Sequence, residues 1–281
     1  MAKEEANMSV RVNSPPSLPA ATIPTRSLAE VFQRLERLAA GSPNLLIYRT
    51  AGFESGGRSY ELPRCLYIGP GGGGEPLRIG IFAGIHGDEP EGTYALIRLL
   101  SLLEQAPDLA KGYCLFIYPV CNPTGFEDRT RGSRGCKDLN REFWRGSKEP
   151  EVRLLESELV SHSLHGVISL HTDSASHGFY GFAHGATLTR YLVEPALEAA
   201  EEFLPRNADE KIDGFRARNG IIREAYQGVL CAPPGVRPRP FEIILETPQV
   251  PPTHLKEAAL VAALRAILTS YREFIAYAPS L

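Results

Sequence analysis

The chain of 281 residues is 43% hydrophobic and 22% charged, which is ordinary for a soluble globular protein and sufficient for a sizeable core. Its formal net charge of -3 gives no indication of a nucleic-acid partner, and its five cysteines show no paired metal spacing, so reduced thiols in a cytoplasmic protein are the simplest interpretation. No apolar run approaches the ~18 residues of a membrane span, and the N-terminus lacks the apolar segment of a secretory signal.

Hydrophobic periodicity divides the chain into alternating elements. Residues 1–26 are rich in proline, serine and alanine, and we expect a flexible lead-in before a single catalytic domain of residues 27–281. Ser27 and Glu30 predict a capping box that opens a first helix, and Gly41 ends it. Strands are predicted at 45–49, 60–68, 77–83, 113–119, 166–173 and 241–248, and further helices at 93–103, 151–162, 188–200 and 255–275. This alternation indicates an α/β sheet with helices on both faces.

Residues 84–92 form the most informative segment. His86 and Glu89 lie on a glycine-rich turn between the strand 77–83 and the helix 93–103, at the sheet edge where open α/β folds place their sites. An imidazole nitrogen and a carboxylate oxygen are both good zinc ligands. The pattern His-x-x-Glu is too short to distinguish a metal site from a polar turn by itself.

A second segment, residues 128–144, concentrates positive charge. Four arginines and a lysine lie among glycines there, and no helix or strand pattern explains them. They form either a solvated basic loop or an anion-binding loop, since arginine binds carboxylates bidentately and stabilises a developing oxyanion.

Two more polar side chains follow predicted strands. His171 ends the apolar run that begins at residue 166, and Glu246 lies near the end of the strand 241–248. The long irregular stretch 215–240, which contains Tyr226, is of a kind that is often functional.

Together these residues indicate a catalytic metal site. Two histidines, His86 and His171, with Glu89 form a three-ligand set that leaves the fourth position of zinc for water, whose pKa the metal lowers to roughly 7. A further carboxylate could take the proton of that water, and an arginine could stabilise the oxyanion. The set is typical of amide hydrolysis.

The ordered motifs resemble those of a known family. Over roughly residues 75–275 the chain resembles the zinc carboxypeptidases (the carboxypeptidase A-like hydrolases) and is similar to the succinylglutamate desuccinylase/aspartoacylase branch. The resemblance rests on His86-x-x-Glu89, Asn122-Pro123-x-Gly125, Arg131, Asp138-Leu139-Asn140-Arg141, His171 and Glu246. It implies a single α/β domain with a mixed, mostly parallel twisted sheet, and one Zn²⁺ per chain.

The resemblance also implies a role for each matching residue. His86, Glu89 and His171 would bind zinc, and Glu246 would be the general base. Arg131 would polarise the scissile carbonyl, because the family's bacterial arginine precedes the asparagine by nine residues (140 − 131 = 9). Arg129 and Arg134 are its nearby rivals. Asn140 and Arg141 would bind the terminal carboxylate of the substrate. Tyr226 would be the substrate-capping tyrosine.

Departures from the family pattern concern the substrate. Cys136-Lys137 stands where Gly-Val is common, and Glu142-Phe143 where Asn-Phe or Asn-Trp is usual. Only 35 residues follow Glu246 (281 − 246), and they predict one helix rather than the β-rich domain of aspartoacylases. This ending favours the single-domain carboxypeptidase or murein-peptide amidase side.

Three functions follow in order of preference. The first is a metallocarboxypeptidase or amidohydrolase that cleaves an amide bond next to a free carboxylate in a small peptide. The second is a deacylase of N-acyl amino acids, and the third a non-catalytic binding protein on the same fold. We expect no nucleic-acid or membrane partner. Affinity alone does not select zinc among divalent ions, and the sequence does not give the oligomeric state.

Overall fold

The computed structural model describes residues 26–49 and 52–277. The expected lead-in, residues 1–26, therefore lies outside the described residues except for Arg26, whose guanidinium donates to the backbone oxygen of Gly87 at 2.6 Å. Among the described residues, no helix combines the length and apolar character that a membrane crossing requires.

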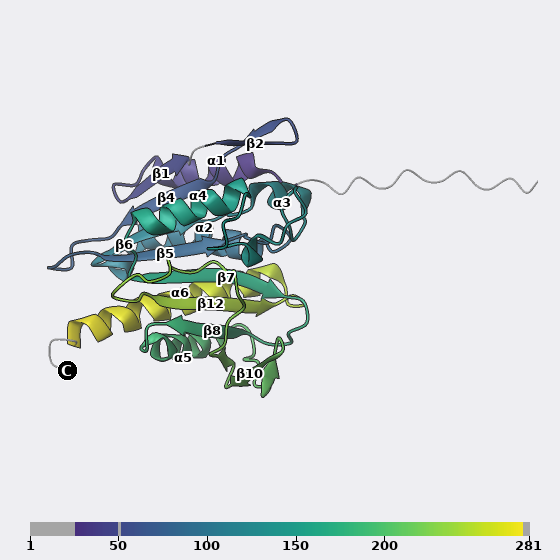
Figure 1. Cartoon of the computed structure of the whole chain (residues 1–281). Helices are drawn as coiled ribbons and strands as arrows, with labels where there is room; N and C mark the ends of the chain where they lie inside the picture. The colour runs from purple at the N-terminus through teal and green to yellow at the C-terminus, as the bar shows by residue number, and fades with distance from the viewer. Residues whose placement is uncertain (1–25, 50–51, 278–281) are drawn as a thin grey trace, which may run out of the picture.

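A mixed ten-stranded sheet forms the centre of the molecule (Figure 1). Its strands occur in the order β1 (Leu45–Arg49), β4 (Pro63–Ile68), β6 (Tyr113–Tyr118), β5 (Leu77–Ala83), β7 (Gly166–Asp173), β12 (Phe241–Pro248), β8 (Tyr180–Gly185), β11 (Ile221–Ile222), β10 (Phe215–Arg218) and β9 (Lys211–Ile212). The central strands β6, β5, β7 and β12 are parallel, and antiparallel pairs flank them on both sides. A separate hairpin joins β2 (Phe53–Ser55) and β3 (Arg58–Tyr60).

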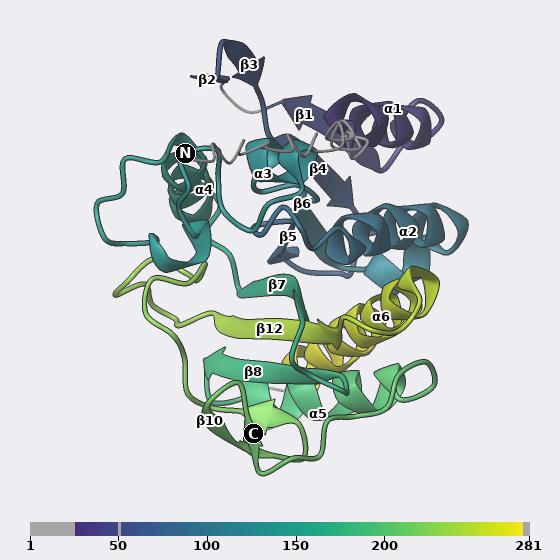
Figure 2. The ribbon, with the colours of Figure 1, turned by 90° about the vertical axis from the view of Figure 1, so that its right-hand side faces the viewer.

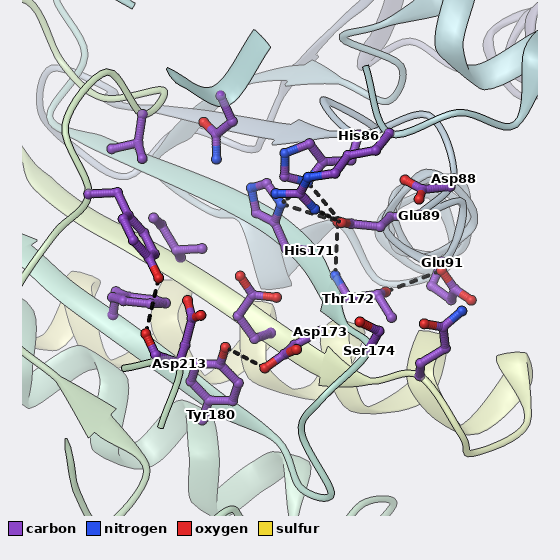
Figure 3. A pocket seen from close by; sticks show the side chains of 18 of the residues that line it. His86, Asp88, Glu89, Glu91, His171, Thr172, Asp173, Ser174, Tyr180 and Asp213 are labelled. Atoms are coloured by element: carbon purple, nitrogen blue, oxygen red, sulfur yellow. Dashed lines mark hydrogen bonds and ion pairs between the residues drawn. The ribbon is translucent and has the colours of Figure 1, made fainter. Parts of the chain in front are cut away.

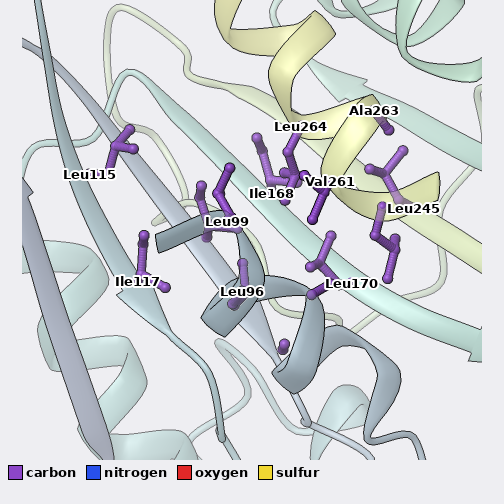
Figure 4. Packing of buried hydrophobic residues seen from close by; sticks show 14 of the residues in the cluster. Leu96, Leu99, Leu115, Ile117, Ile168, Leu170, Leu245, Val261, Ala263 and Leu264 are labelled. Atoms are coloured by element: carbon purple, nitrogen blue, oxygen red, sulfur yellow. The ribbon is translucent and has the colours of Figure 1, made fainter. Parts of the chain in front are cut away.

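Helices cover both faces of this sheet (Figure 2). One face carries α1 (Leu28–Ala39), α2 (Glu91–Gln105), α5 (Thr189–Ala200) and α6 (Thr253–Tyr277), and the other carries α4 (Pro150–Ser161). The larger apolar core lies between the sheet and the first group, where side chains of α2 and α6 interdigitate with those of β6, β7 and β12 (Figure 4). A smaller core lies under α4. The predicted fold class, an α/β domain with a mixed sheet covered on both faces, is confirmed.

Most predicted elements are confirmed to within a few residues. The Ser27 hydroxyl accepts from the N–H of Glu30, as the predicted cap requires. Several details differ. The strand expected at 60–68 begins at residue 63, after the β2–β3 hairpin. The motif Asn122-Pro123-x-Gly125 opens the short helix α3 (Pro123–Asp128), because the Asn122 side chain caps it and proline suits its first position. The strands β8, β9, β10 and β11 were not predicted, and β10 and β11 lie at the start of the stretch 215–240 that was expected to be irregular.

Candidate active site

Three neighbouring parallel strands bring the predicted site residues together. β5 lies beside β7, and β7 lies beside β12 with His171 opposite Glu246. His86 and Glu89 follow β5 on a turn that glycine permits, since Gly84 has a φ of 62° and a Cβ on Gly87 would lie 1.9 Å from the carbonyl carbon of Gly125. The carboxyl ends of these strands therefore form one edge that carries all the predicted metal ligands and the predicted base. Figure 3 shows the three predicted ligands, His86, Glu89 and His171, close together.

His86, Glu89 and His171 form the candidate metal centre. The Nδ1 atoms of the two histidines lie 3.3 Å apart. Glu89 Oε1 lies 2.8 Å from Nδ1 of His86, and Glu89 Oε2 lies 3.2 Å from Nδ1 of His171. Ligands of a tetrahedral zinc ion at metal–nitrogen distances of about 2.0–2.1 Å are about 3.3 Å from one another. The spacing and chemistry of this buried donor set therefore fit such an ion.

Hydrogen bonds behind the two rings determine which nitrogen faces the centre. Asp138 Oδ1 lies 3.1 Å from Nε2 of His86, and because an ionised carboxylate only accepts, that Nε2 carries the proton. Nε2 of His171 lies 2.8 Å from the Ser169 hydroxyl. Both Nδ1 atoms can then offer a lone pair to a metal, and partners of this kind hold the ligating rings in orientation.

The charge states of the ligands follow from burial and these contacts. Burial raises the pKa of Glu89, but hydrogen bonds with His171 and His86 outweigh it and hold that pKa well below its usual range. Burial dominates at His171 and lowers its pKa. At His86, bonds to Asp138 and Glu89 outweigh burial and raise the pKa. An ionised Glu89 and a neutral His171 are the forms that bind a cation.

Glu246 lies beside this centre without a partner. It lines the same cavity, and among the described residues it makes no hydrogen bond or ion pair. Burial, and then the charge of Glu89, raise its pKa well above its usual value. A carboxylate with increased proton affinity next to a metal centre is suited to general base catalysis.

Of the three rival arginines, Arg131 reaches the centre. Its Nη1 lies 3.3 Å from Glu89 Oε1, and its Nε lies 3.2 Å from Asp138 Oδ2. Arg134 instead pairs with Asp128 at 2.8 Å and donates to the Tyr60 hydroxyl. Arg129 ends α3 in a left-handed conformation and does not line the cavity.

The predicted substrate-binding residues line the same cavity. Asn140 is buried, and its Oδ1 accepts from the N–H of Leu230 at 2.8 Å, which leaves its amide NH₂ for a ligand. The Arg141 guanidinium lies 4.2 Å from the centre of the Tyr226 ring. The Tyr226 hydroxyl donates to the backbone oxygen of Asp213 at 3.0 Å. All three side chains line the cavity, whose volume is about 260 Å³.

Sequence comparison finds a family model that matches part of this chain. Residues 77–207, slightly less than half of the chain, are similar to the succinylglutamate desuccinylase/aspartoacylase catalytic domain. The resemblance expected from the motifs is thus confirmed. No curated protein matches the chain in sequence.

Several solved structures share the fold. A proposed metallopeptidase from Shewanella amazonensis is 23% identical over 86% of this chain and 91% of its own, with a TM-score of 0.70. A metallo-carboxypeptidase from Burkholderia cenocepacia is 17% identical over 89% of this chain and 70% of its own, with a TM-score of 0.67. One from Pseudomonas aeruginosa, in complex with (2-guanidinoethylmercapto)succinic acid, is 21% identical over 89% of this chain and 70% of its own, with a TM-score of 0.62.

The matched family model is that of a catalytic domain, and the solved structures show that the fold is shared with metallo-carboxypeptidases.

Several residues at the site were not assigned a role from the sequence. Ser169 could have been found, because it precedes His171 by two residues and therefore lies on the same face of the strand. Asp138 was part of a recognised motif, but its contact with His86 depends on how the loop folds. Asp173 and Asp213 also line the cavity, and no local pattern marks either of them.

Proposed function

We propose that the chain is a metal-dependent hydrolase, with one Zn²⁺ per chain, that cleaves an amide bond next to a free carboxylate in a small peptide. The observation that carries this proposal is the convergence of three ligands, an unpartnered Glu246 and Arg131 on one cavity. A zinc ion held by His86, Glu89 and His171 would supply Lewis acidity, which lowers the pKa of water to roughly 7.

Glu246 is the proposed general base. Its raised pKa and its freedom from other partners support a carboxylate that takes the proton of the attacking water. The same carboxyl group would then give the proton to the leaving amine. Arg131 is the proposed donor to the oxyanion. Its guanidinium reaches the metal ligand Glu89 while about half of its side chain remains exposed to the cavity and solvent, which leaves N–H groups for the carbonyl oxygen.

Asn140 and Arg141 are the proposed binding groups for the substrate carboxylate. An amide NH₂ and a guanidinium on one wall present donors in a geometry that suits a carboxylate. Tyr226, stacked on Arg141, would cover the bound residue. A substrate whose carboxylate is bound there would have its terminal amide cleaved if that amide lies between Glu246 and Arg131.

A deacylase of N-acyl amino acids is the second candidate. The match of residues 77–207 to the succinylglutamate desuccinylase/aspartoacylase catalytic domain favours it, and the catalytic groups would act identically. A non-catalytic binding protein is the third candidate, and the intact set of ligands and base argues against it. We further propose that residues 27–281 form one catalytic domain. A cytoplasmic location is supported by the five free cysteines.

The decisive experiment compares wild-type protein with the Glu246→Gln variant, both loaded with zinc. Short peptides, γ-linked peptides and N-acyl amino acids form the substrate panel, and the substrate class hydrolysed separates the first two candidates. We expect the variant to keep its zinc and lose turnover. Full activity of the variant would exclude Glu246 as the base, and a wild-type protein inactive on the whole panel would favour the binding protein.

A further inference from the structure

The strands β12 and β8 lie side by side (Figure 2), and a row of paired residues leads away from Glu246 along them. In the antiparallel pair of β12 and β8, Glu246 lies opposite Tyr180, Ile244 opposite Phe182, and Glu242 opposite His184. Side chains two residues apart share one face of a strand. The row therefore begins at the candidate active site, becomes apolar at Ile244 and Phe182, and ends in the polar pair Glu242 and His184.

The polar end of this row lies in a second cavity of about 410 Å³. Tyr226, Val229 and Ile244 line both this cavity and the candidate active site, so the two cavities meet at these three side chains. The second cavity is therefore adjacent to the candidate active site at Ile244.

The second cavity contains a buried nitrogen without a partner. Nε2 of His184 is inaccessible to solvent and makes no hydrogen bond, whereas the other ring nitrogen bonds the backbone of Glu224. Because a carbonyl oxygen only accepts, that Nδ1 carries the proton, and Nε2 is left as an acceptor. Burial lowers the pKa of His184, which keeps the ring neutral. Buried acceptors without donors are rare in folded proteins and indicate a missing partner.

Glu242, opposite His184, is a second acceptor with spare capacity. Its side chain is 15% exposed, and its nearest cation, Arg239, lies 3.9 Å away and is 59% exposed. One oxygen, Oε1, accepts from the N–H of Ala232 at 3.1 Å. Burial raises the pKa of Glu242, as expected of a carboxylate that lacks a close cationic partner. Nε2 of His184 and the Glu242 carboxylate are therefore acceptors without a matching donor, and a positively charged donor suits both.

We infer that the second cavity receives a flexible apolar stem that ends in an ammonium group, as in a lysine-type side chain, on the residue whose free carboxylate binds Arg141. The inference rests on the proposed function and specifies its substrate class. The stem packs on Ile244 and Phe182, and the ammonium donates to Nε2 of His184 and to Glu242.

The length of the cavity agrees with this occupant. Ile244 and Glu242 are two residues apart, or about 7 Å along the strand, which is comparable with an extended four-carbon stem. Arg145 and Arg239 also line the second cavity, but both are exposed, so solvent screens them.

The test uses zinc-loaded full-length protein and four N-acetyl-alanyl dipeptides that end in lysine, norleucine, glutamine or glutamate. We expect kcat/KM for the lysine peptide to exceed that for the norleucine peptide by about tenfold or more, the usual effect of a hydrogen bond to a charged group. Glu242→Gln and His184→Leu should each reduce this preference severalfold. Glu202→Gln, at an exposed carboxylate outside both cavities, is the matched control and should change neither the preference nor kcat/KM for either peptide.

The other outcomes distinguish failure of the inference from failure of the proposed function. If norleucine or glutamine is hydrolysed as well as lysine, or if both cavity variants keep the preference, the inference is wrong and the proposed function stands. If no peptide is hydrolysed, the proposed function fails for peptides, and calorimetry with the same peptides then tests the cavity alone. Preferential binding of the lysine peptide that Glu242→Gln removes would sustain the inference, and equal binding of all four would overturn it.

Discussion

The ammonium of Lys256 lies 2.6 Å from the carboxylate of Glu91, directly behind the candidate metal centre. The side chains are 4% and 10% exposed. Glu91 also accepts from the hydroxyl of Thr172, whose backbone N–H donates to the metal ligand Glu89. The pair therefore joins α6 to the start of α2 and to the strand that carries His171, and it holds Glu89 from behind.

Replacing Lys256 by methionine should destabilise the protein strongly. The change leaves the Glu91 carboxylate buried without its cation, and breaking a buried pair in this way costs about 3–5 kcal/mol. Urea unfolding measures the difference. The double variant Lys256→Met/Glu91→Met should be more stable than Lys256→Met, because no charge stays buried. A double variant less stable than Lys256→Met would contradict this account of the pair.

Removal of the metal should lower the melting temperature, because a ligand that binds the native state stabilises it. Elemental analysis should find about one divalent ion per chain in the wild-type protein, as a single three-ligand site predicts. In His171→Ala, metal content and chelator sensitivity should both disappear. The matched control is His177→Ala, because the side chain of His177 is 69% exposed and lies away from the centre. Loss of metal in the control as well would argue against a specific site.

Asp138→Asn should weaken metal binding by about 10–100-fold, the usual effect of changing a partner behind a ligating histidine. The amide cannot offer two anionic oxygens, so the contacts with His86 and Arg131 are weakened together. Metal titration of the apoprotein measures the affinity. An unchanged metal affinity would mean that Asp138 stabilises only the loop in which it lies.

Arg131→Gln should reduce catalysis, whereas Arg134→Gln should reduce stability. Arg131 reaches the centre, so its loss should reduce kcat by about 10²–10³-fold, as loss of an oxyanion donor does. Arg134 bonds Asp128 and Tyr60, so its loss should affect stability and leave kcat nearly unchanged. Steady-state kinetics on the best substrate of the panel separates the two. Equal losses of kcat would remove Arg131 from the proposed role.

The central strands and all three proposed metal ligands could be predicted from the sequence. β5 and β7 are mostly buried and read as apolar runs, whereas β12 alternates buried with partly buried residues, and parallel strands bring their carboxyl ends to one edge. This is why His86, His171 and Glu246 could be placed together although they are far apart in the chain.

The supporting contacts could not be predicted, because they depend on tertiary packing. Lys256 lies on a helix whose spacing predicts a core-facing stripe, and nothing in its neighbourhood indicates a partner 165 residues away. β8 was missed because its alternation of aromatic residues with glycine and alanine is only six residues long. The role of His184 was missed for the same reason, because it depends on the register between β8 and β12.

Glu158 connects α4 to the sheet and should make the free energy of unfolding depend on pH. Its Oε2 accepts from Arg64 at 2.7 Å, from the Tyr118 hydroxyl at 2.5 Å, and lies 3.1 Å from Nε2 of His162. Burial raises the pKa of Glu158, but the bonds from Tyr118 and Arg64 outweigh it, and the pKa falls below its usual 4.5. The folded state thus holds the ionised form more tightly than the unfolded state does.

The sign of the effect follows from this shift. The stabilisation is complete above the unfolded pKa and is lost as the pH falls through the lower folded pKa. Glu158→Gln should therefore cost about 1–3 kcal/mol at pH 7, and its difference from wild type should shrink as the pH falls below about 4. Urea unfolding at pH 7 and pH 3 measures both values, with Glu202→Gln as the exposed control. A difference as large at pH 3 as at pH 7 would mean that Glu158 acts through its shape and not its charge.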